Sequence, residues 1–129
     1  MLPCLDEAAA LPSALAALPS GWPVLVVDNG STDDTVAVAR ARGARVVVEP
    51  RRGYGAAVHA GLRNARADLV AVLDGDGSLD AAILPGLAEA VRAGRADLAV
   101  GRRGPTGPRV WPWHPPAGKA PVSGLLADR

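Results

Sequence analysis

The chain has 129 residues, of which 49% are hydrophobic and 21% are charged, and its formal net charge is +1. This length and composition fit one globular domain with a buried core and exclude an intrinsically disordered chain. Every apolar run is interrupted well before the roughly 20 residues that a membrane-spanning helix needs. The first residues form no secretory signal, so we expect a soluble, cytoplasmic protein without a transmembrane segment.

Cysteine, proline and charge are distributed unevenly along the chain. Cys4 is the only cysteine, which excludes an internal disulfide and a metal site made of several cysteines, and we interpret it as a small buried hydrophobe. After Gly101 the chain has five basic residues against the single acid Asp128, and six of its twelve prolines. We therefore expect residues 104–129 to form a Pro-rich, basic and largely irregular tail. Such a tail could associate with an anionic membrane surface, and a merely solvated end is the alternative.

Apolar runs alternate with segments of helical spacing along the first hundred residues. Buried strands are predicted at residues 24–27, 45–49, 69–73 and 96–100. Helices are predicted at residues 31–42, 56–65 and 84–93. Ser31 is the expected N-cap of the first helix, and Pro85 fits the first turn of the last. This alternation predicts an α/β fold with a mostly parallel sheet and helices on both faces.

Polar residues follow each predicted strand. In a parallel sheet the carboxyl ends of the strands lie at one edge, where ligands collect. The residues expected at that edge are Asp28, Glu49, the loop 51–55, Asp74, Asp76 and the sequence Gly101-Arg102-Arg103. The sequence therefore predicts a rim where acids, arginines and glycine-rich loops converge.

The sequence Asp74-Gly75-Asp76 directly follows the predicted strand at residues 69–73. A hard divalent cation that must also bind a diphosphate takes only one or two carboxylates from the protein, and two acids on a tight turn suit this requirement. Gly75 would let a phosphorylated ligand approach the main chain closely. An ordinary Asp-Gly turn is the alternative reading of the same residues.

Other rim residues have roles that their chemistry suggests. Asp28 could accept a hydrogen bond from a base N–H or a ribose hydroxyl. Arg52 and its neighbour Arg51 can present planar forks to diphosphate oxygens, and a solvated surface charge is the alternative for each arginine. Gly53 would let a phosphate sit against backbone N–H groups at the start of the next helix. His59 lies within a predicted helix and is expected to serve packing or the surface.

Five motifs in order together resemble glycosyltransferase family 2, the inverting GT-A enzymes that include dolichyl-phosphate mannosyltransferase and bacterial polyprenyl-phosphate sugar synthases. The motifs are Pro3-Cys4-Leu5-Asp6-Glu7, Val26-Val27-Asp28-Asn29-Gly30-Ser31-Thr32-Asp33, Arg52-Gly53-Tyr54-Gly55-Ala56-Ala57, Asp74-Gly75-Asp76 and Val100-Gly101-Arg102-Arg103. The resemblance covers residues 1–103, which it identifies as the nucleotide-sugar-binding half of a GT-A domain. It implies transfer of a sugar from a nucleotide diphosphate sugar, with Mg²⁺ or Mn²⁺ as cofactor.

The resemblance also implies residue roles. Pro3, Leu5 and Glu7 belong to the family's first nucleotide-contacting loop, and Asp28 matches the residue that reads the base. Asp76 matches the direct metal ligand, and Asp74 assists near the ribose or the metal. Arg52 and Gly53 belong to the matched phosphate-side loop, and Arg103 corresponds to the arginine of the family's Gly-Ser-Arg element.

The chain departs from the family pattern at both ends. The strand before Pro3 is reduced to Met1-Leu2, and only 26 residues follow Arg103, where the family places an acceptor-binding half with its general base. An anionic acceptor such as a polyprenyl phosphate would need little or no general base. A non-catalytic nucleotide-sugar-binding module or an inactive truncated fragment therefore remains an alternative to an active enzyme.

Two further classes fit the sequence poorly. A dinucleotide-dependent oxidoreductase would carry its glycine-rich fingerprint after the first strand, where this chain has Cys4-Leu5-Asp6-Glu7. Nucleic-acid binding has little support, because basic residues are few and the aromatic residues show no stacking pattern.

Overall fold

The computed structural model describes residues 1–101, so the expected tail at 104–129 and the residues Arg102 and Arg103 lie outside the described residues. Three parallel strands, β1 (Leu2–Cys4), β2 (Leu25–Asp28) and β3 (Arg45–Val48), form a sheet with β2 in the centre. All four residues of β2 are buried. A central strand covered on both faces has no position that faces solvent, which explains its uninterrupted apolar run.

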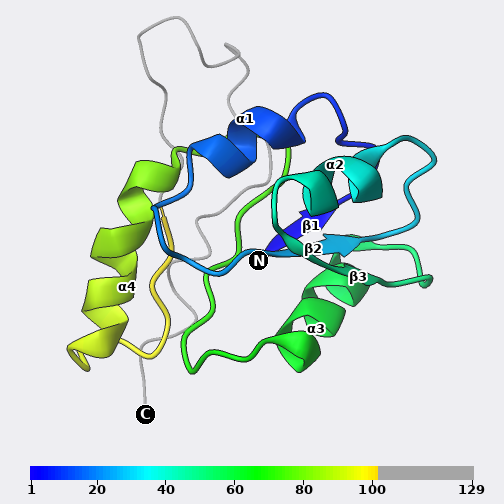
Figure 1. The fold of residues 1–129 in the computed structure, drawn as a ribbon. Coiled ribbons are helices and arrows are strands. Elements are labelled where there is room, and N and C mark those ends of the chain that lie inside the picture. Colours follow the sequence, from blue (N-terminus) through cyan, green and yellow to red (C-terminus); the bar gives the residue numbers. More distant parts are fainter. Residues whose placement is uncertain (102–129) are drawn as a thin grey trace, which may run out of the picture.

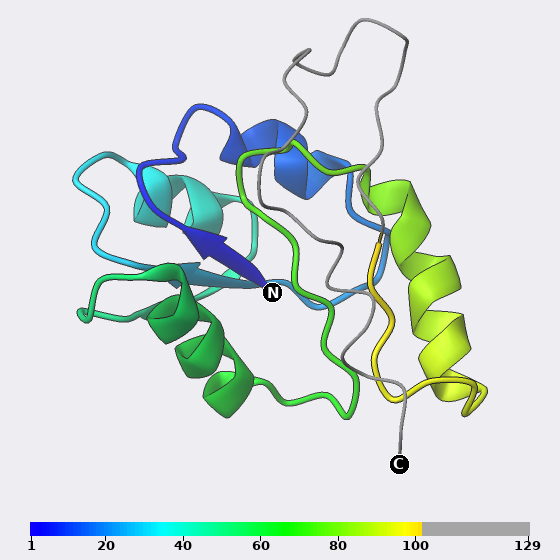
Figure 2. The ribbon, with the colours of Figure 1, turned by 180° about the vertical axis from the view of Figure 1, so that it is seen from behind.

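Helices cover both faces of this sheet. α1 (Leu11–Ala16) and α2 (Thr35–Ala41) lie on one face, and α3 (Tyr54–Asn64) lies on the other (Figures 1 and 2). Alternate residues of β2 serve the two faces: Val26 packs with Leu2 and Leu11, whereas Leu25 and Val27 pack with Ala57 and Ala60 of α3. The predicted α/β architecture with a parallel sheet and helices on both faces is confirmed.

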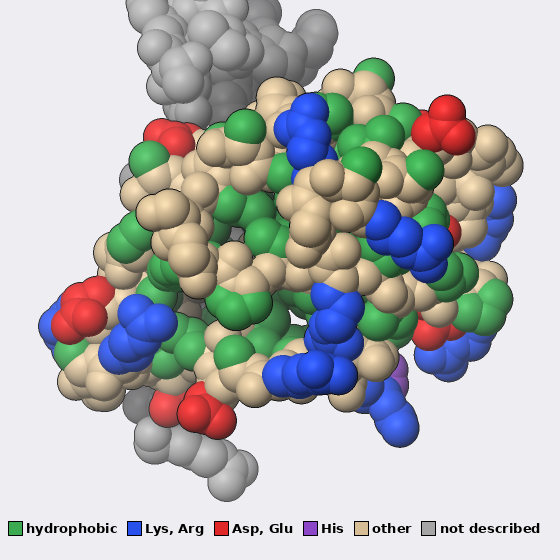
Figure 3. Space-filling model, in the orientation of Figure 1, with side chains coloured by type: hydrophobic (Ala, Val, Ile, Leu, Met, Phe, Trp, Pro, Cys, Tyr) green, Lys and Arg blue, Asp and Glu red, His purple; other side chains and the backbone are tan. Residues whose placement is uncertain are grey.

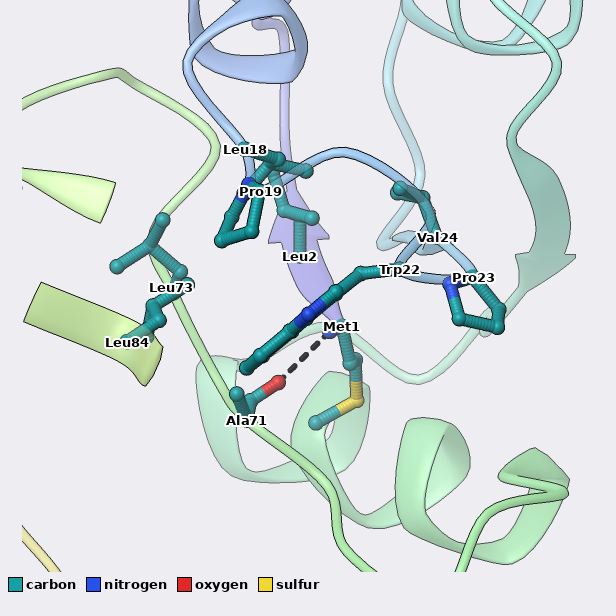
Figure 4. Close-up of a pocket in the computed structure, with 10 residues that line it drawn as sticks. All are labelled: Met1, Leu2, Leu18, Pro19, Trp22, Pro23, Val24, Ala71, Leu73 and Leu84. Atoms are coloured by element: carbon teal, nitrogen blue, oxygen red, sulfur yellow. Dashed lines mark hydrogen bonds between the residues drawn. The ribbon is translucent and has the colours of Figure 1, made fainter. Parts of the chain in front are cut away.

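Residues 69–73 do not form a regular strand, which corrects the prediction. Residues 71–73 nevertheless run beside Met1: the Met1 amino group donates to the Ala71 carbonyl (2.7 Å, Figure 4), and the Leu73 N–H donates to the Met1 carbonyl (3.1 Å). These two bonds have the pattern of a parallel pair. Because β1 begins at Leu2, Met1 alone pairs with this segment, and no ladder extends back to Leu69.

Residues 96–100 also lack strand structure, contrary to the prediction, and Leu98 and Val100 are 69% and 77% exposed. A β-rich run becomes a strand only when a neighbouring backbone pairs with it, and none of the described strands lies beside this one. Together with α4 (Leu84–Arg92) and the segment 69–73, these residues line an apolar hollow of about 1210 Å³. Figure 3 shows apolar side chains around this recess.

The predicted helices form with shifted bounds. α3 and α4 agree with the prediction to within two residues, Pro85 lies in the first turn of α4, and a short 3₁₀ helix, η1 (Ala81–Ile83), precedes it. α2 begins at Thr35 with Asp34 as its N-cap residue, so the prediction of Ser31 as N-cap is wrong. The Ser31 hydroxyl instead accepts a hydrogen bond from the Asp6 N–H (2.9 Å). α1 was not among the predicted helices.

None of the helices within residues 1–101 has both the length and the apolar character that crossing a bilayer requires.

Candidate functional site

The loops that follow β1, β2 and β3 lie at one edge of the sheet, and the turn after residues 71–73 joins them (Figure 2). The turn is placed by Gly75, which packs so closely on the end of β1 that a Cβ there would lie 2.4 Å from the Cys4 Sγ and 3.5 Å from the Pro3 carbonyl oxygen. A glycine is therefore required for this approach. The loops after β1, β2 and β3 and the turn at Asp74-Gly75-Asp76 therefore share one edge, as predicted. Gly101, also expected at this edge, packs instead near Ile83 and Leu87, and Arg102 and Arg103 lie outside the described residues.

Hydrogen bonds connect the loop after β1 to the loop after β2. The Asp6 carboxylate accepts from the Thr32 N–H (2.6 Å), the Glu7 N–H donates to the Thr35 hydroxyl (2.8 Å), and the Ala8 N–H donates to Asp33 (2.9 Å). Asp6 has a φ of 56°, a left-handed conformation that Asp tolerates better than most residues. Each loop therefore supplies side chains to the backbone of the other, and hydrogen bonds in both directions connect the two loops.

Asp28 is buried at the end of β2, with 4% of its surface exposed. Its two carboxylate oxygens accept from the N–H groups of Gly30 and Ser31, both at 3.3 Å. These bonds fold the turn after β2 around the carboxylate. Each oxygen keeps lone-pair capacity, so the predicted contact with a base or ribose is chemically compatible with this geometry.

The structure distinguishes the two arginines of the loop after β3. Arg51 forms an ion pair with Glu49, whose Oε1 lies 3.1 Å from the Arg51 Nε. This hydrogen bond holds the pKa of Glu49 below its usual value. Arg52 instead reaches over the tip of β2 and donates to the Gly30 carbonyl (3.3 Å). Within residues 1–101, a carboxylate therefore pairs with the guanidinium of Arg51 but not with that of Arg52.

Acidic side chains also gather at the rim. The pKa of Glu7 is raised, first by burial and next by the negative charges of Asp76, Asp33, Asp6 and Asp74. Glu7 and the Asp74-Gly75-Asp76 turn are far apart in the sequence, so their electrostatic coupling shows that folding brings them together. The Asp76 carboxylate accepts from the Ser78 N–H (2.8 Å), which orients it on the turn.

These acids fit a divalent cation with open coordination positions. Their oxygens are hard ligands, and their mutual repulsion would be relieved by a bound cation. Within residues 1–101, no group of three or more Asp, Glu, His or Cys side chains is arranged as a closed ligand set. A pair of carboxylates that leaves the remaining positions to phosphate oxygens is the arrangement expected for Mg²⁺ or Mn²⁺ at a diphosphate.

The predicted site residues are therefore distributed as follows. Pro3 is buried in the middle of β1, Leu5 is 42% exposed and Glu7 is half-buried in the next loop. Asp28, Arg52, Gly53, Asp74 and Asp76 all lie at the same edge of the sheet. Arg103 lies outside the described residues. Their shared placement agrees with the expectation, while their individual roles stay predictions.

Two rim residues stood in the quoted motifs, but no role was assigned to them from the sequence. Tyr54 begins α3, and its pKa is raised by burial and then by the charge of Asp74 and a hydrogen bond with it, so it lies beside the acidic turn. Its position between Gly53 and Gly55, in a loop already predicted to lie at the rim, could have marked it as a rim residue. Asn29 is buried beside Asp28 and bonds to the loop after β3. Nothing in its local sequence distinguishes it from a turn asparagine.

Comparison with known proteins agrees with this fold. The sequence model of Glycosyl transferase family 2 matches residues 1–125. An uncharacterised glycosyltransferase of Mycobacterium tuberculosis (strain ATCC 25618 / H37Rv) is 53% identical over 129 residues, which are 100% of this chain and 59% of that protein. Dodecaprenyl-phosphate galacturonate synthase of Rhizobium johnstonii is 35% identical over 108 residues, which cover 78% of this chain and 31% of the synthase. The chain belongs to glycosyltransferase family 2.

Solved structures extend the likeness to three dimensions. The crystal structure of M. tuberculosis glucosyl-3-phosphoglycerate synthase with Mn²⁺, UDP and phosphoglyceric acid has 32% identity and a TM-score of 0.63, over 70% of this chain and 37% of that one. The complex of that enzyme with Mg²⁺ and UDP gives a TM-score of 0.62 at 32% identity, with the same coverage. The fold is of the GT-A type. This chain spans about 59% of the length of its mycobacterial relative.

Proposed function

We propose that this chain forms the donor-binding part of a metal-dependent, inverting glycosyltransferase that uses a nucleoside diphosphate sugar. The observation that carries the proposal is the convergence, on one edge of the sheet, of the acidic turn at Asp74 and Asp76 with the Arg52 loop and the buried Asp28. Membership in family 2 supports the activity. Related structures that contain UDP with Mn²⁺ or Mg²⁺ support the donor class and the cation.

In this proposal each rim residue has one task. Asp76, assisted by Asp74, holds Mg²⁺ or Mn²⁺, which when bound stabilises negative charge on the leaving diphosphate as a Lewis acid. Arg52 presents its planar guanidinium to the diphosphate oxygens, and the Gly53 backbone permits their close approach. Asp28 accepts from the nucleoside, and Pro3, Leu5 and Glu7 form the adjoining wall.

We further propose a polyprenyl phosphate as acceptor. A phosphate oxygen is already an anion at neutral pH, so it can attack the anomeric carbon with little help from a general base. A relative named dodecaprenyl-phosphate galacturonate synthase supports this acceptor class. Attack from the face opposite the leaving diphosphate would invert the configuration of the anomeric carbon.

A thermal-shift panel tests the donor site. We expect UDP or a UDP-sugar, or the corresponding GDP compounds, to raise the unfolding temperature, and to raise it further with Mn²⁺. A ligand at 100 times its Kd would add about 2.7 kcal/mol to the free energy of unfolding. Asp76→Asn keeps an oxygen acceptor for the Ser78 N–H but removes the charge, and should abolish the Mn²⁺-dependent part of the shift.

Asp68→Asn is the matched control, because Asp68 is an exposed acid outside the rim, and its Mn²⁺-dependent shift should equal that of the unaltered chain. An unchanged shift in Asp76→Asn would exclude Asp76 as the ligand. Sugar transfer to a polyprenyl phosphate, measured separately with radiolabelled donor, distinguishes the enzyme from the alternative. Metal-dependent donor binding without transfer would favour a non-catalytic nucleotide-sugar-binding module or an inactive fragment.

A further inference from the structure

We infer that Asn29 is a positioning residue of this site, which sets the affinity for the donor diphosphate by holding the Arg52 loop without touching the donor. The inference rests on the proposed function, because it assigns the diphosphate to Arg52. It depends on hydrogen bonds between Asn29 and the loop after β3.

Asn29 is buried, with 5% of its surface exposed. All hydrogen bonds of its side-chain amide go to the loop after β3. The Nδ2 group donates to the Glu49 carbonyl (3.0 Å) and to the Arg51 carbonyl (2.7 Å), and the Oδ1 atom accepts from the Gly53 N–H (2.7 Å). A side-chain amide has two N–H groups and one oxygen. Every group of this amide therefore has a partner in residues 49–53.

These bonds hold the backbone on both sides of Arg52. Asn29 bonds to the carbonyl of Arg51, in the peptide group before Arg52, and to the N–H of Gly53, in the peptide group after it. Gly53 has a φ of 124°, a backbone conformation that residues other than glycine rarely adopt. The loop must maintain this conformation. The Arg52 guanidinium then returns to the tip of β2, where it donates to the Gly30 carbonyl. Asn29 and Arg52 thus connect the same two loops.

Other side chains of similar size would not hold this loop. Leucine would fill the space but would take away the acceptor of the Gly53 N–H and the donors to the Glu49 and Arg51 carbonyls. Aspartate could still accept from Gly53, but its oxygens would face the carbonyls of Glu49 and Arg51, which require a donor. It would also add a negative charge next to Asp28. Asparagine combines the shape, the two donors and the acceptor that this loop needs.

A double-mutant cycle on UDP binding, measured by calorimetry with Mn²⁺ present, tests the inference. We expect Asn29→Ala to weaken UDP binding on the order of ten-fold, within the range of couplings between residues of one hydrogen-bond network. In the Arg52→Gln background the same change should have almost no further effect, because its influence passes through Arg52. Hydrogen exchange of the Gly53 amide should accelerate in Asn29→Ala, as the amide loses its acceptor.

Thr35→Ala is the matched control, since it also removes a buried hydrogen-bonding side chain but one that holds the loop after β1. The fold-change in UDP affinity that Thr35→Ala causes should be the same with and without Arg52→Gln, because the two residues act independently. If Asn29→Ala does not fold, Asn29→Ser adds no charge but is too short to span the contacts to Arg51 and Gly53, and it is expected to show the same coupling to Arg52.

The outcomes separate this inference from the proposed function. UDP binding to the unaltered chain with multiplying effects of Asn29→Ala and Arg52→Gln would overturn the positioning role alone. Unweakened binding in Asn29→Ala would do the same. Failure of the unaltered chain to bind any nucleoside diphosphate would overturn the proposed function, and the positioning role with it.

Discussion

Cys4 shows how a single side chain reports on the folded state. Burial raises the pKa of its thiol from an ordinary 9.0 to about 12, and the nearby charges of Glu7 and Asp28 add to the effect. The thiolate is the reactive form of cysteine, so three pKa units reduce its population roughly 1,000-fold. The predicted role of Cys4 as a small buried hydrophobe is confirmed, since it is 3% exposed.

We predict that Cys4 resists alkylation by iodoacetamide at pH 8 in the folded chain and reacts when urea unfolds it. Mass spectrometry of the labelled fraction across the urea transition measures this. Because the thiol has a raised pKa in the folded state, its stabilising contribution is present below pH 9 and is lost as the pH rises toward 12. Rapid labelling without urea would contradict the buried position.

Gly75 is the residue on which the placement of the acidic turn depends. A Cβ at Gly75 would lie 2.4 Å from the Cys4 Sγ, a short buried side chain with little room to move. We predict that Gly75→Ala lowers the free energy of unfolding by about 1–3 kcal/mol, the usual cost of overpacking. Chemical denaturation followed by circular dichroism measures this.

Gly86 provides the control for that substitution. It lies in the first turn of α4, where a Cβ would meet nothing within 4 Å. Alanine is the better helix former, so Gly86→Ala is expected to stabilise the chain by up to about 1 kcal/mol. Equal effects of the two substitutions would mean that the turn does not pack on β1.

At the scale of elements, Thr35 joins the start of α2 to the loop after β1. Its side chain is completely buried, its hydroxyl accepts from the Glu7 N–H, and it donates to Asp33. We predict that Thr35→Val, which keeps the shape, lowers the free energy of unfolding by about 1–3 kcal/mol by leaving the Glu7 N–H without an acceptor. Thr32→Val, at an exposed position, should cost less in the same urea titration.

The same contact gives a pH dependence. The hydrogen bond from Thr35 holds the pKa of Asp33 below its ordinary 3.8. The stability that this bond provides is therefore present above pH 3.8 and is lost as the pH falls through the lower folded value. We expect the unfolding curves of the unaltered chain and of Thr35→Val to approach each other as the pH falls below 3.8. A constant difference down to pH 2 would contradict this.

At the scale of the whole molecule, the apolar hollow beside α4 has a measurable consequence. It has a volume of about 1210 Å³, and apolar residues such as Leu98 and Val100 are exposed at it. Exposed apolar surfaces of this kind bind hydrophobic dyes. We predict that the folded chain enhances ANS fluorescence below its unfolding temperature. Leu98→Glu places a charge at the hollow and should reduce this enhancement at least two-fold, because a loss of dye-binding energy of about one methylene's transfer energy is enough for that.

Leu62→Glu is the matched control, because Leu62 is a comparably exposed leucine on α3 that does not line the hollow. Its ANS enhancement should equal that of the unaltered chain. An equal loss of ANS fluorescence in Leu98→Glu and Leu62→Glu would mean that the dye does not bind at the hollow.

Particular elements show why some predictions succeeded. The apolar run before Asp28 predicted β2, because a central strand must be apolar on both faces, and local spacing was enough to find α3 and α4. The prediction of Ser31 as an N-cap failed because the Asp6 backbone, remote in the sequence, competes for its hydroxyl. The segments 69–73 and 96–100 have strand-forming residues, but within residues 1–101 only Met1 pairs with the first and no strand lies beside the second.

The class of fold, the family and the group of polar residues after the apolar runs follow from the sequence alone, because apolar periodicity and motif order are properties of the unfolded chain as well. Which of those residues act together depends on the folded chain. Folding separated Arg52 from the Glu49-bound Arg51, placed the acidic turn on the end of β1 and directed Asn29 to the loop after β3. These assignments depend on hydrogen bonds and close packing between residues distant in sequence, which form only when the chain has folded.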